Sequence, residues 1–166
     1  SMLSSALLRG LLPGAARHVA VSGGVAEDLA RLLAVPRRSI EVIHNPVNLA
    51  RVAAGSAAPV GHSWLSGEEP VILGMGRLTG QKDHATLFRA VARLCAERPL
   101  RLILLGDGPD RAALERERDR LGLAGRIDMP GFVDNPFAWL ARASAFALSS
   151  RFEGFGNVLV EAVSYT

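Results

Sequence analysis

Short apolar runs alternate along the chain with segments whose apolar residues recur every three or four positions. Four of the runs predict strands, at 71–75, 102–105, 127–129 and 145–148. Helices are predicted between them, from Asp83 to Pro99, from Pro109 to about Leu121, and from Pro136 to Ala143. Strands that are apolar on both faces are typical of a parallel sheet covered on both sides. The pattern therefore predicts an α/β fold with a Rossmann-like parallel sheet flanked by helices.

A shorter strand–helix–strand pattern precedes this region. Runs at 18–21 and 40–43 predict two strands, and between them an amphipathic helix is expected after Ser22, a good N-cap residue. Residues 3–12 predict a further amphipathic helix, for which contact with a membrane surface is an alternative role. Residues 46–69 are rich in Ala, Gly, Ser and Pro without a clear period, which indicates a linker.

Composition excludes several classes of protein. With 166 residues of which 49% are hydrophobic, the chain is not intrinsically disordered. A single cysteine, Cys95, excludes a disulfide framework and a cysteine zinc site. The net charge is +3, and every basic residue except Lys82 is an arginine. Because arginine alternates with acidic residues over 115–120, this segment indicates a solvated helix face and not a nucleic-acid-binding stripe.

The loop after the strand at 71–75 carries the first candidate chemistry. Gly76 lets the backbone approach a ligand, and Arg77 and the sole lysine, Lys82, bring two cations. A planar guanidinium fork and a compact ammonium together suit a diphosphate. A glycine turn with two surface charges is the alternative interpretation of this loop.

Two further loops follow predicted strands. Gly106 and Gly108 lie before a helix, whose N-terminus attracts anions, although a tight turn explains them equally well. Glu153 precedes a glycine-containing turn into a last predicted helix, at 157–163, and Glu161 lies in the second turn of this helix. Two carboxylates at this spacing can accept hydrogen bonds from different hydroxyls of one ligand, and helix capping with surface acids is the alternative.

The segment EGFGNVLVEA, at 153–162, resembles the signature of the retaining glycosyltransferases of the GT-B fold, family four. Four other segments are similar to this family in order and spacing: AVSGGVAEDLARLL with VIHNPVNL, GMGRLTGQKDHATLFRAVARL, LLGDGPDRAAL, and MPGFVDNPFAWLARASAFALSSRFEGFG. The resemblance extends over about residues 18–164.

The resemblance implies a division into three segments. Residues 1–45 would be the terminal segment of the acceptor-binding half, and 46–69 the linker. Residues 70–166 would be the C-terminal, donor-nucleotide-sugar-binding half, truncated at its end. Because most of the acceptor-binding half is absent, we expect this chain alone to bind donor at most weakly and not to catalyse transfer. We also expect self-association or rearranged packing, since the strands at 18–21 and 40–43 would otherwise present unpaired edges.

The family pattern also implies a role for each candidate residue. Arg77 and Lys82 would bind the donor diphosphate and stabilise its departing charge, and Glu153 would contact the transferred sugar as the third catalytic residue. Glu161 would bind the ribose hydroxyls. Gly76, Gly106 and Gly108 are further donor-binding positions. Phe132 and Val133 would lie near the nucleobase, and Gly154, Phe155, Gly156 and Asn157 near the sugar and distal phosphate.

The implied activity is transfer of a hexose from a UDP- or GDP-sugar to a saccharide or lipid-linked acceptor, in bacterial polysaccharide and cell-envelope biosynthesis. No metal, cofactor or nucleic acid is expected, and the location is expected to be cytoplasmic, with peripheral contact with the inner face of the membrane as an option. Two alternatives stay open: a non-catalytic nucleotide-binding or interaction module, and another GT-B enzyme such as a nucleotide-sugar epimerase. The sequence does not identify the base, the sugar or the acceptor.

Overall fold

The computed structural model describes residues 14–154 and 156, which form two compact units. The larger unit contains residues 47–152, and the smaller one contains the described residues up to Pro46 together with those that follow Phe152. The helices predicted at 3–12 and 157–163 lie outside the described residues.

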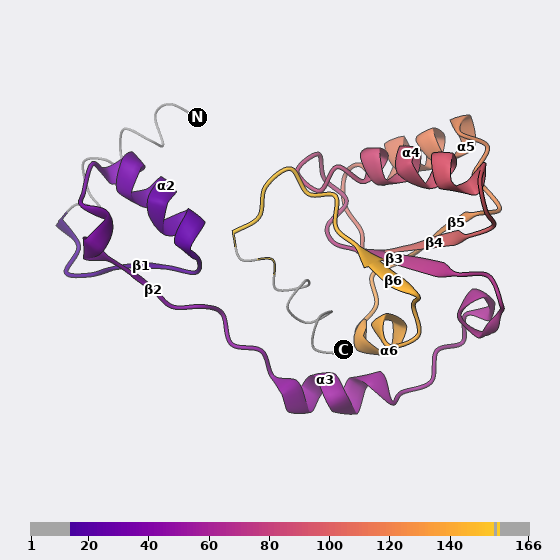
Figure 1. Cartoon of the computed structure of the whole chain (residues 1–166), viewed down its shortest axis with the longest axis horizontal. Coiled ribbons are helices and arrows are strands. Elements are labelled where there is room, and N and C mark those ends of the chain that lie inside the picture. The colour runs from indigo at the N-terminus through magenta and orange to yellow at the C-terminus, as the bar shows by residue number, and fades with distance from the viewer. Residues whose placement is uncertain (1–13, 155, 157–166) are drawn as a thin grey trace. The chain divides into compact units, whose positions relative to one another are not determined.

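A four-stranded, fully parallel sheet forms the centre of the larger unit (Figure 1). Its strands are β3 (Val71–Met75), β4 (Arg101–Leu105), β5 (Ile127–Gly131) and β6 (Ala145–Ala147), in the order β5-β4-β3-β6. After β3 the chain builds outward through β4 to β5 and then crosses back to place β6 on the other side of β3. The predicted Rossmann-like parallel sheet is therefore confirmed. In such sheets, ligands bind at the carboxyl ends of the strands near the point where the strand order reverses.

Helices cover both faces of this sheet. Figure 1 shows α4 (His84–Cys95) and α5 (Arg111–Arg120) on one face. The opposite face is covered by α3 (Leu49–Ser56) and α6 (Phe137–Leu140). Helix α5 begins two residues later than predicted, because Asp110 and not the residue before Pro109 is its N-cap.

Alternating side chains of β4 explain why both faces need a cover. Leu102 and Leu104 pack in the hydrophobic cluster that contains the apolar residues of α4 and α5. Ile103 and Leu105 point the other way and pack with buried residues of α3 and α6. All four side chains are at most 1% exposed, so β4 is apolar and buried on both faces after Arg101.

The segment interpreted as a linker contains regular structure that its sequence pattern did not predict. It includes α3 and a short 3₁₀ helix, η3 (Ser63–Ser66). Only Val52 of α3 is buried, and most of the remaining residues of this helix are Ala, Gly and Ser. Small residues give no hydrophobic period, so the helix is specified by packing of Val52 against the sheet and not by an apolar stripe.

The smaller unit is a strand–helix–strand motif. Strands β1 (His18–Ala20) and β2 (Ile40–Val42) pair in parallel, and α2 (Gly23–Leu33) and a 3₁₀ turn, η2 (Arg37–Ser39), connect them. As predicted, Ser22 is the N-cap of α2, and its hydroxyl accepts a hydrogen bond from the amide of Val25 at 3.3 Å. Within the described residues each strand pairs with the other along one edge, which partly satisfies the edges that the sequence analysis expects to be unpaired. Self-association stays a prediction.

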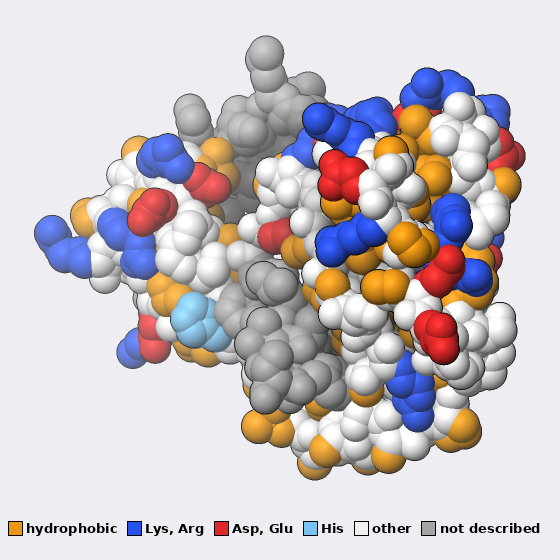
Figure 2. Space-filling model, turned by 45° about the vertical axis from the view of Figure 1, so that its right-hand side comes forward, with side chains coloured by type: hydrophobic (Ala, Val, Ile, Leu, Met, Phe, Trp, Pro, Cys, Tyr) orange, Lys and Arg blue, Asp and Glu red, His pale blue; other side chains and the backbone are white. Residues whose placement is uncertain are grey.

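Charged side chains on the surface of the larger unit are largely paired with one another. Glu117 of α5 bonds to Arg120 at 2.7 Å and lies 3.5 Å from Arg89 of α4. Figure 2 shows basic and acidic side chains interspersed on the face that it presents. This arrangement confirms that α5 exposes a solvated face of mixed charge. None of the helices in the described part of the chain is both long enough and apolar enough to cross a bilayer.

Close contact between two backbone loops determines the carboxyl edge of the sheet. The amide of Leu78, after β3, donates to the carbonyl of Asp107, after β4, at 2.9 Å, and the amide of Asp110 donates back to Leu78 at 3.1 Å. A Cβ on Gly108 would lie 2.5 Å from the carbonyl oxygen of Leu78. Only glycine therefore allows the two loops to approach this closely.

Replacing Gly108 should separate these loops. We expect Gly108→Ala to lower the free energy of unfolding by about 1–3 kcal/mol, the usual cost of overpacking. Gly80→Ala is the matched control, because a Cβ there would meet no atom within 4 Å. We expect that variant to change stability by less than about 1 kcal/mol. Urea unfolding of the two variants tests this, and equal stabilities would contradict the packing role of Gly108.

Candidate functional site

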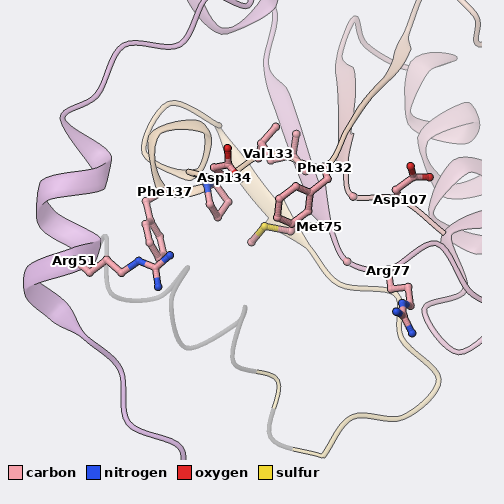
Figure 3. Close-up of a pocket in the computed structure, with 12 residues that line it drawn as sticks. Arg51, Met75, Arg77, Asp107, Phe132, Val133, Asp134 and Phe137 are labelled. Atoms are coloured by element: carbon pink, nitrogen blue, oxygen red, sulfur yellow. The ribbon is translucent and has the colours of Figure 1, made fainter.

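A cavity of about 680 Å³ lies at the carboxyl ends of β3, β4 and β5 in the larger unit (Figure 3). Its size is in the range of small-molecule binding sites. It is lined by Arg51, Met75, Gly76, Arg77, Leu105, Gly106, Asp107, Phe132, Val133, Asp134, Pro136 and Phe137.

Five residues that the sequence identified as binding residues line this one cavity: Gly76, Arg77, Gly106, Phe132 and Val133. They come from three different loops, after β3, β4 and β5. Parallel strands end at the same edge of a sheet, so the chain brings these loops together although they are separated by up to 57 positions in the sequence. Their binding roles stay predictions, but their convergence makes a common ligand physically possible.

The walls of the cavity combine apolar and charged groups. Met75 and Val133 are half-buried, whereas Phe132 is 77% exposed and presents an aromatic ring at the cavity. Figure 3 shows Arg51 beside Phe137 and Arg77 on the other side of Met75 and Phe132. The guanidinium of Arg51 lies 5.9 Å from the centre of the Phe137 ring, a cation–π distance that orients it.

Three charged residues of the cavity were not predicted from the sequence. Asp107 lies two residues after the end of β4 and Asp134 three residues after the end of β5, a signal that applies to any polar residue in such a loop. Arg51 gave no signal, because its helix, α3, has no apolar period. The apolar lining residues Met75, Leu105, Pro136 and Phe137 were likewise not identified as site residues.

Lys82 and Gly108 do not line the cavity, although they belong to its loops. The side chain of Lys82 lies across Gly76, since a Cβ on that glycine would be 3.3 Å from Cε of the lysine. Lys82 is therefore adjacent to Arg77 in one loop. Gly108 faces the backbone of Leu78, which gives it a packing role independent of any ligand.

The third predicted loop belongs in part to the smaller unit. Glu153, Gly154 and Gly156 are exposed or half-buried there. The hydroxyl of Ser22 donates a hydrogen bond to the carbonyl of Gly154 at 2.7 Å, which ties this loop to the start of α2. The other predicted residues lie outside the described residues: Phe155, Asn157 and Glu161.

His84, the first residue of α4, is a buried titratable group beside the loop of Arg77 and Lys82. Its side chain is 4% exposed, and within the described residues neither ring nitrogen makes a hydrogen bond of good geometry. Burial lowers the pKa of the His84 imidazole below its ordinary value of 6.5, an effect that the nearby backbone of Arg77 only partly offsets. The charge of Lys82 lowers this pKa further. His84 is therefore a neutral, packed histidine at neutral pH.

Among residues 14–154 and 156, no group of three His, Cys, Asp or Glu side chains could hold a metal ion. The chemistry available at the cavity is that of its two kinds of charged group. Arg77 and the adjacent Lys82 can bind an anion, and Asp107 and Asp134 can accept hydrogen bonds from hydroxyl or N–H groups.

Two family models match the chain. The one described as "Glycosyl transferases group 1" matches residues 69–166, and the one described as "Glycosyltransferase Family 4" matches residues 1–51. The first covers more than half of the chain and includes every residue of the cavity except Arg51.

Curated and solved relatives agree with these matches. A Campylobacter jejuni N-acetylgalactosamine-N,N'-diacetylbacillosaminyl-diphospho-undecaprenol 4-alpha-N-acetylgalactosaminyltransferase is 31% identical over 99% of this chain and 43% of its own length. The solved apo lipopolysaccharide outer core galactosyltransferase WaaB is 30% identical over 91% of this chain and 41% of its own, with a TM-score of 0.69. Anabaena HepE in complex with UDP-glucose is 23% identical over 99% and 47%, with a TM-score of 0.84, and shows the same fold. The chain thus spans less than half the length of these relatives, whose fold is GT-B.

The buried imidazole of His84 generates a prediction about pH. Because its pKa is lower in the folded than in the unfolded chain, the unfolded chain binds more protons below about pH 6.5. We therefore expect stability to fall as the pH is lowered from 7.5 to 5.5, and His84→Leu to reduce this fall. Arg98→Ala, at an exposed position and without a group that titrates in this range, is the control and should keep the wild-type dependence. Melting temperatures across this range test the prediction, and parallel curves for wild type and His84→Leu would contradict it.

Proposed function

The chain belongs to the group 1 glycosyltransferases, and we propose that it forms the donor-binding part of a retaining enzyme that transfers a hexose from a nucleoside-diphosphate sugar. The acceptor is a saccharide or a lipid-linked saccharide of the bacterial cell envelope. In this proposal residues 1–45 complete the acceptor-binding half, 46–69 link the two halves, and 70–166 bind the donor.

One observation carries the proposal: loops after three parallel strands converge on a cavity that has Arg77 in its wall and Lys82 adjacent to it. A diphosphate is the ligand chemistry that best matches an arginine fork beside a lysine. Anabaena HepE was solved in complex with UDP-glucose, which is consistent with this choice.

The rest of the donor can be assigned from the character of the walls. A nucleobase would lie against Phe132 and Val133, because an exposed aromatic ring and an apolar neighbour offer it a stacking surface. Asp107 and Asp134 would accept hydrogen bonds from ribose hydroxyls or base N–H groups, in addition to the expected contact of Glu161 with the ribose. Glu153 and the glycine turn after it would contact the transferred sugar.

In the reaction, the acceptor hydroxyl oxygen forms a bond to the anomeric carbon of the sugar while the bond from that carbon to the diphosphate oxygen breaks. The proton of the acceptor hydroxyl goes to the departing diphosphate. Arg77 and Lys82 stabilise the negative charge that grows on this leaving group, and a preorganised cation pair is most effective there. Attack and departure on the same face of the sugar would retain its anomeric configuration.

The names of two relatives support a lipid-linked acceptor. The Campylobacter relative is named for a substrate linked to diphospho-undecaprenol, and WaaB is named for the lipopolysaccharide outer core. Both names describe substrates attached to a lipid. We therefore propose a lipid-linked acceptor and a peripheral position at the cytoplasmic face of the membrane, where nucleotide sugars are available.

Removing either cation should weaken donor binding. We expect millimolar UDP to raise the melting temperature of the wild-type chain, and Arg77→Ala or Lys82→Met to lose most of this rise. Arg98→Ala, an exposed arginine after α4, is the control and should respond like wild type. In the whole enzyme each site substitution should reduce kcat/KM by the equivalent of about 2–4 kcal/mol, the size of one lost charge-stabilising donor.

Two outcomes would contradict the proposal. If wild type binds UDP and both site variants bind it equally well, Arg77 and Lys82 are not the diphosphate ligands. If UDP does not alter the melting temperature of wild type, a non-catalytic interaction module becomes the better interpretation of the chain.

A further inference from the structure

Three hydrogen bonds join residues 81–83, at the end of the loop after β3, to residues 149–152. The hydroxyl of Ser149 donates to the carbonyl of Lys82 at 2.8 Å. The amide of Arg151 donates to the carbonyl of Gln81 at 2.9 Å, and the side-chain amide of Gln81 donates to the carbonyl of Phe152 at 3.0 Å. We call this set of contacts, together with the ion pair of Asp83 and Arg151, the loop clamp.

The aspartate of this ion pair has an unusual backbone conformation. Asp83 has φ 46° and ψ 43°, the left-handed region that non-glycine residues rarely adopt. Its carboxylate lies 3.2 Å from Nε of Arg151. The Asp83 side chain is 18% exposed and that of Arg151 is 67% exposed, so water reaches this pair mainly from the arginine side. Burial alone would raise the pKa of the Asp83 carboxyl, but hydrogen bonds from Arg151 and Thr86 lower it, which keeps the pair charged.

Hydrogen bonds hold the backbone of Lys82 at both its amide and its carbonyl. Its amide donates to the carbonyl of Thr79 at 2.9 Å, and its carbonyl accepts from Ser149. Both backbone groups of Lys82 are therefore satisfied, one by its own loop and one by a residue 67 positions away. The left-handed Asp83 then turns the chain into α4, while the Lys82 side chain extends across Gly76.

We infer that Ser149 and Arg151 are positioning residues, which hold the backbone of Lys82 so that its ammonium is preorganised beside Arg77 for the donor diphosphate. The inference rests on the proposed function of Lys82. A long, flexible lysine loses less binding energy when its backbone is already fixed. Because the clamp uses the chain just before Glu153, it also couples the diphosphate loop to the segment that leads to the proposed sugar-binding residue.

The single variants Ser149→Ala and Arg151→Ala, each compared with the wild-type chain, test this inference. Two quantities are measured: hydrogen–deuterium exchange of the segment 76–88 without ligand, and the Kd of UDP. We expect each variant to raise exchange in this segment and to weaken UDP binding by roughly three- to tenfold, the effect of losing one hydrogen bond. Ser149→Thr retains the hydroxyl and should restore both quantities.

Matched controls separate the clamp from general destabilisation. Ser56→Ala removes a similar hydroxyl-to-carbonyl bond, to Ala53 at 2.7 Å, in α3, and Arg98→Ala removes an exposed arginine. Neither should change exchange at 76–88 or the Kd of UDP. Exchange of β4 amides reports whether each variant is folded, and if Arg151→Ala is not, Arg151→Lys and Ser149→Thr still allow the comparison.

Three outcomes would overturn the inference, and they differ from one another. Unchanged exchange and unchanged Kd in Ser149→Ala and Arg151→Ala would show that the clamp does not position Lys82. Weaker UDP binding with unchanged exchange would show that these side chains contact the ligand directly. If wild type itself fails to bind UDP, the proposed function is overturned and the positioning role falls with it, whatever the exchange data show.

Discussion

The contact between the backbones of two loops, after β3 and after β4, is the constraint on which the candidate site depends. The amide of Leu78 bonds to Asp107, and the amide of Gly76 bonds to Leu105 at 3.0 Å, so the loops run side by side without side chains between them. A Cβ on Gly106 would lie 2.1 Å from the carbonyl oxygen of Gly76. This close approach places Arg77 in the cavity wall, and it leaves Lys82 at the far end of the same loop, where the clamp fixes it.

Charge is distributed differently at the two ends of the parallel strands. At their amino ends, Glu69 bonds to Arg126 at 2.8 Å and also to Arg101, and these hydrogen bonds, that of Arg101 foremost, lower the pKa of the Glu69 carboxyl. Such pairs join the starts of β3, β4 and β5. At the carboxyl ends, cations and carboxylates line an open cavity, where they are available to a ligand. The sheet therefore separates a structural ion-pair cluster from a binding surface.

The sequence predicted those parts of the fold that depend on local pattern. Two local patterns show which residues are buried: the apolar runs of β3 and β4, and the helical spacing of apolar residues in α4. A parallel sheet then brings Arg77, Gly106 and Phe132 to one edge. It could not predict α3, whose small residues have no apolar stripe, and so it missed Arg51. The clamp was also beyond sequence reasoning, because the bond from Ser149 to Lys82 joins residues with no local relation. The role of Gly108 was ambiguous for a related reason: a glycine near a ligand and one under a neighbouring backbone look alike in sequence.

The central claim is that the cavity at the carboxyl ends of β3, β4 and β5 is a nucleoside-diphosphate site. Titration of the ¹⁵N-labelled chain with UDP, followed by the chemical shifts of its backbone amides, tests it most directly. The account predicts that the largest shifts occur in the loops at 76–83, 106–108 and 132–134, whereas the amino-terminal cluster around Glu69, Arg101 and Arg126 is unchanged. Saturable shifts confined to that cluster, or to the strands of the smaller unit, would contradict it.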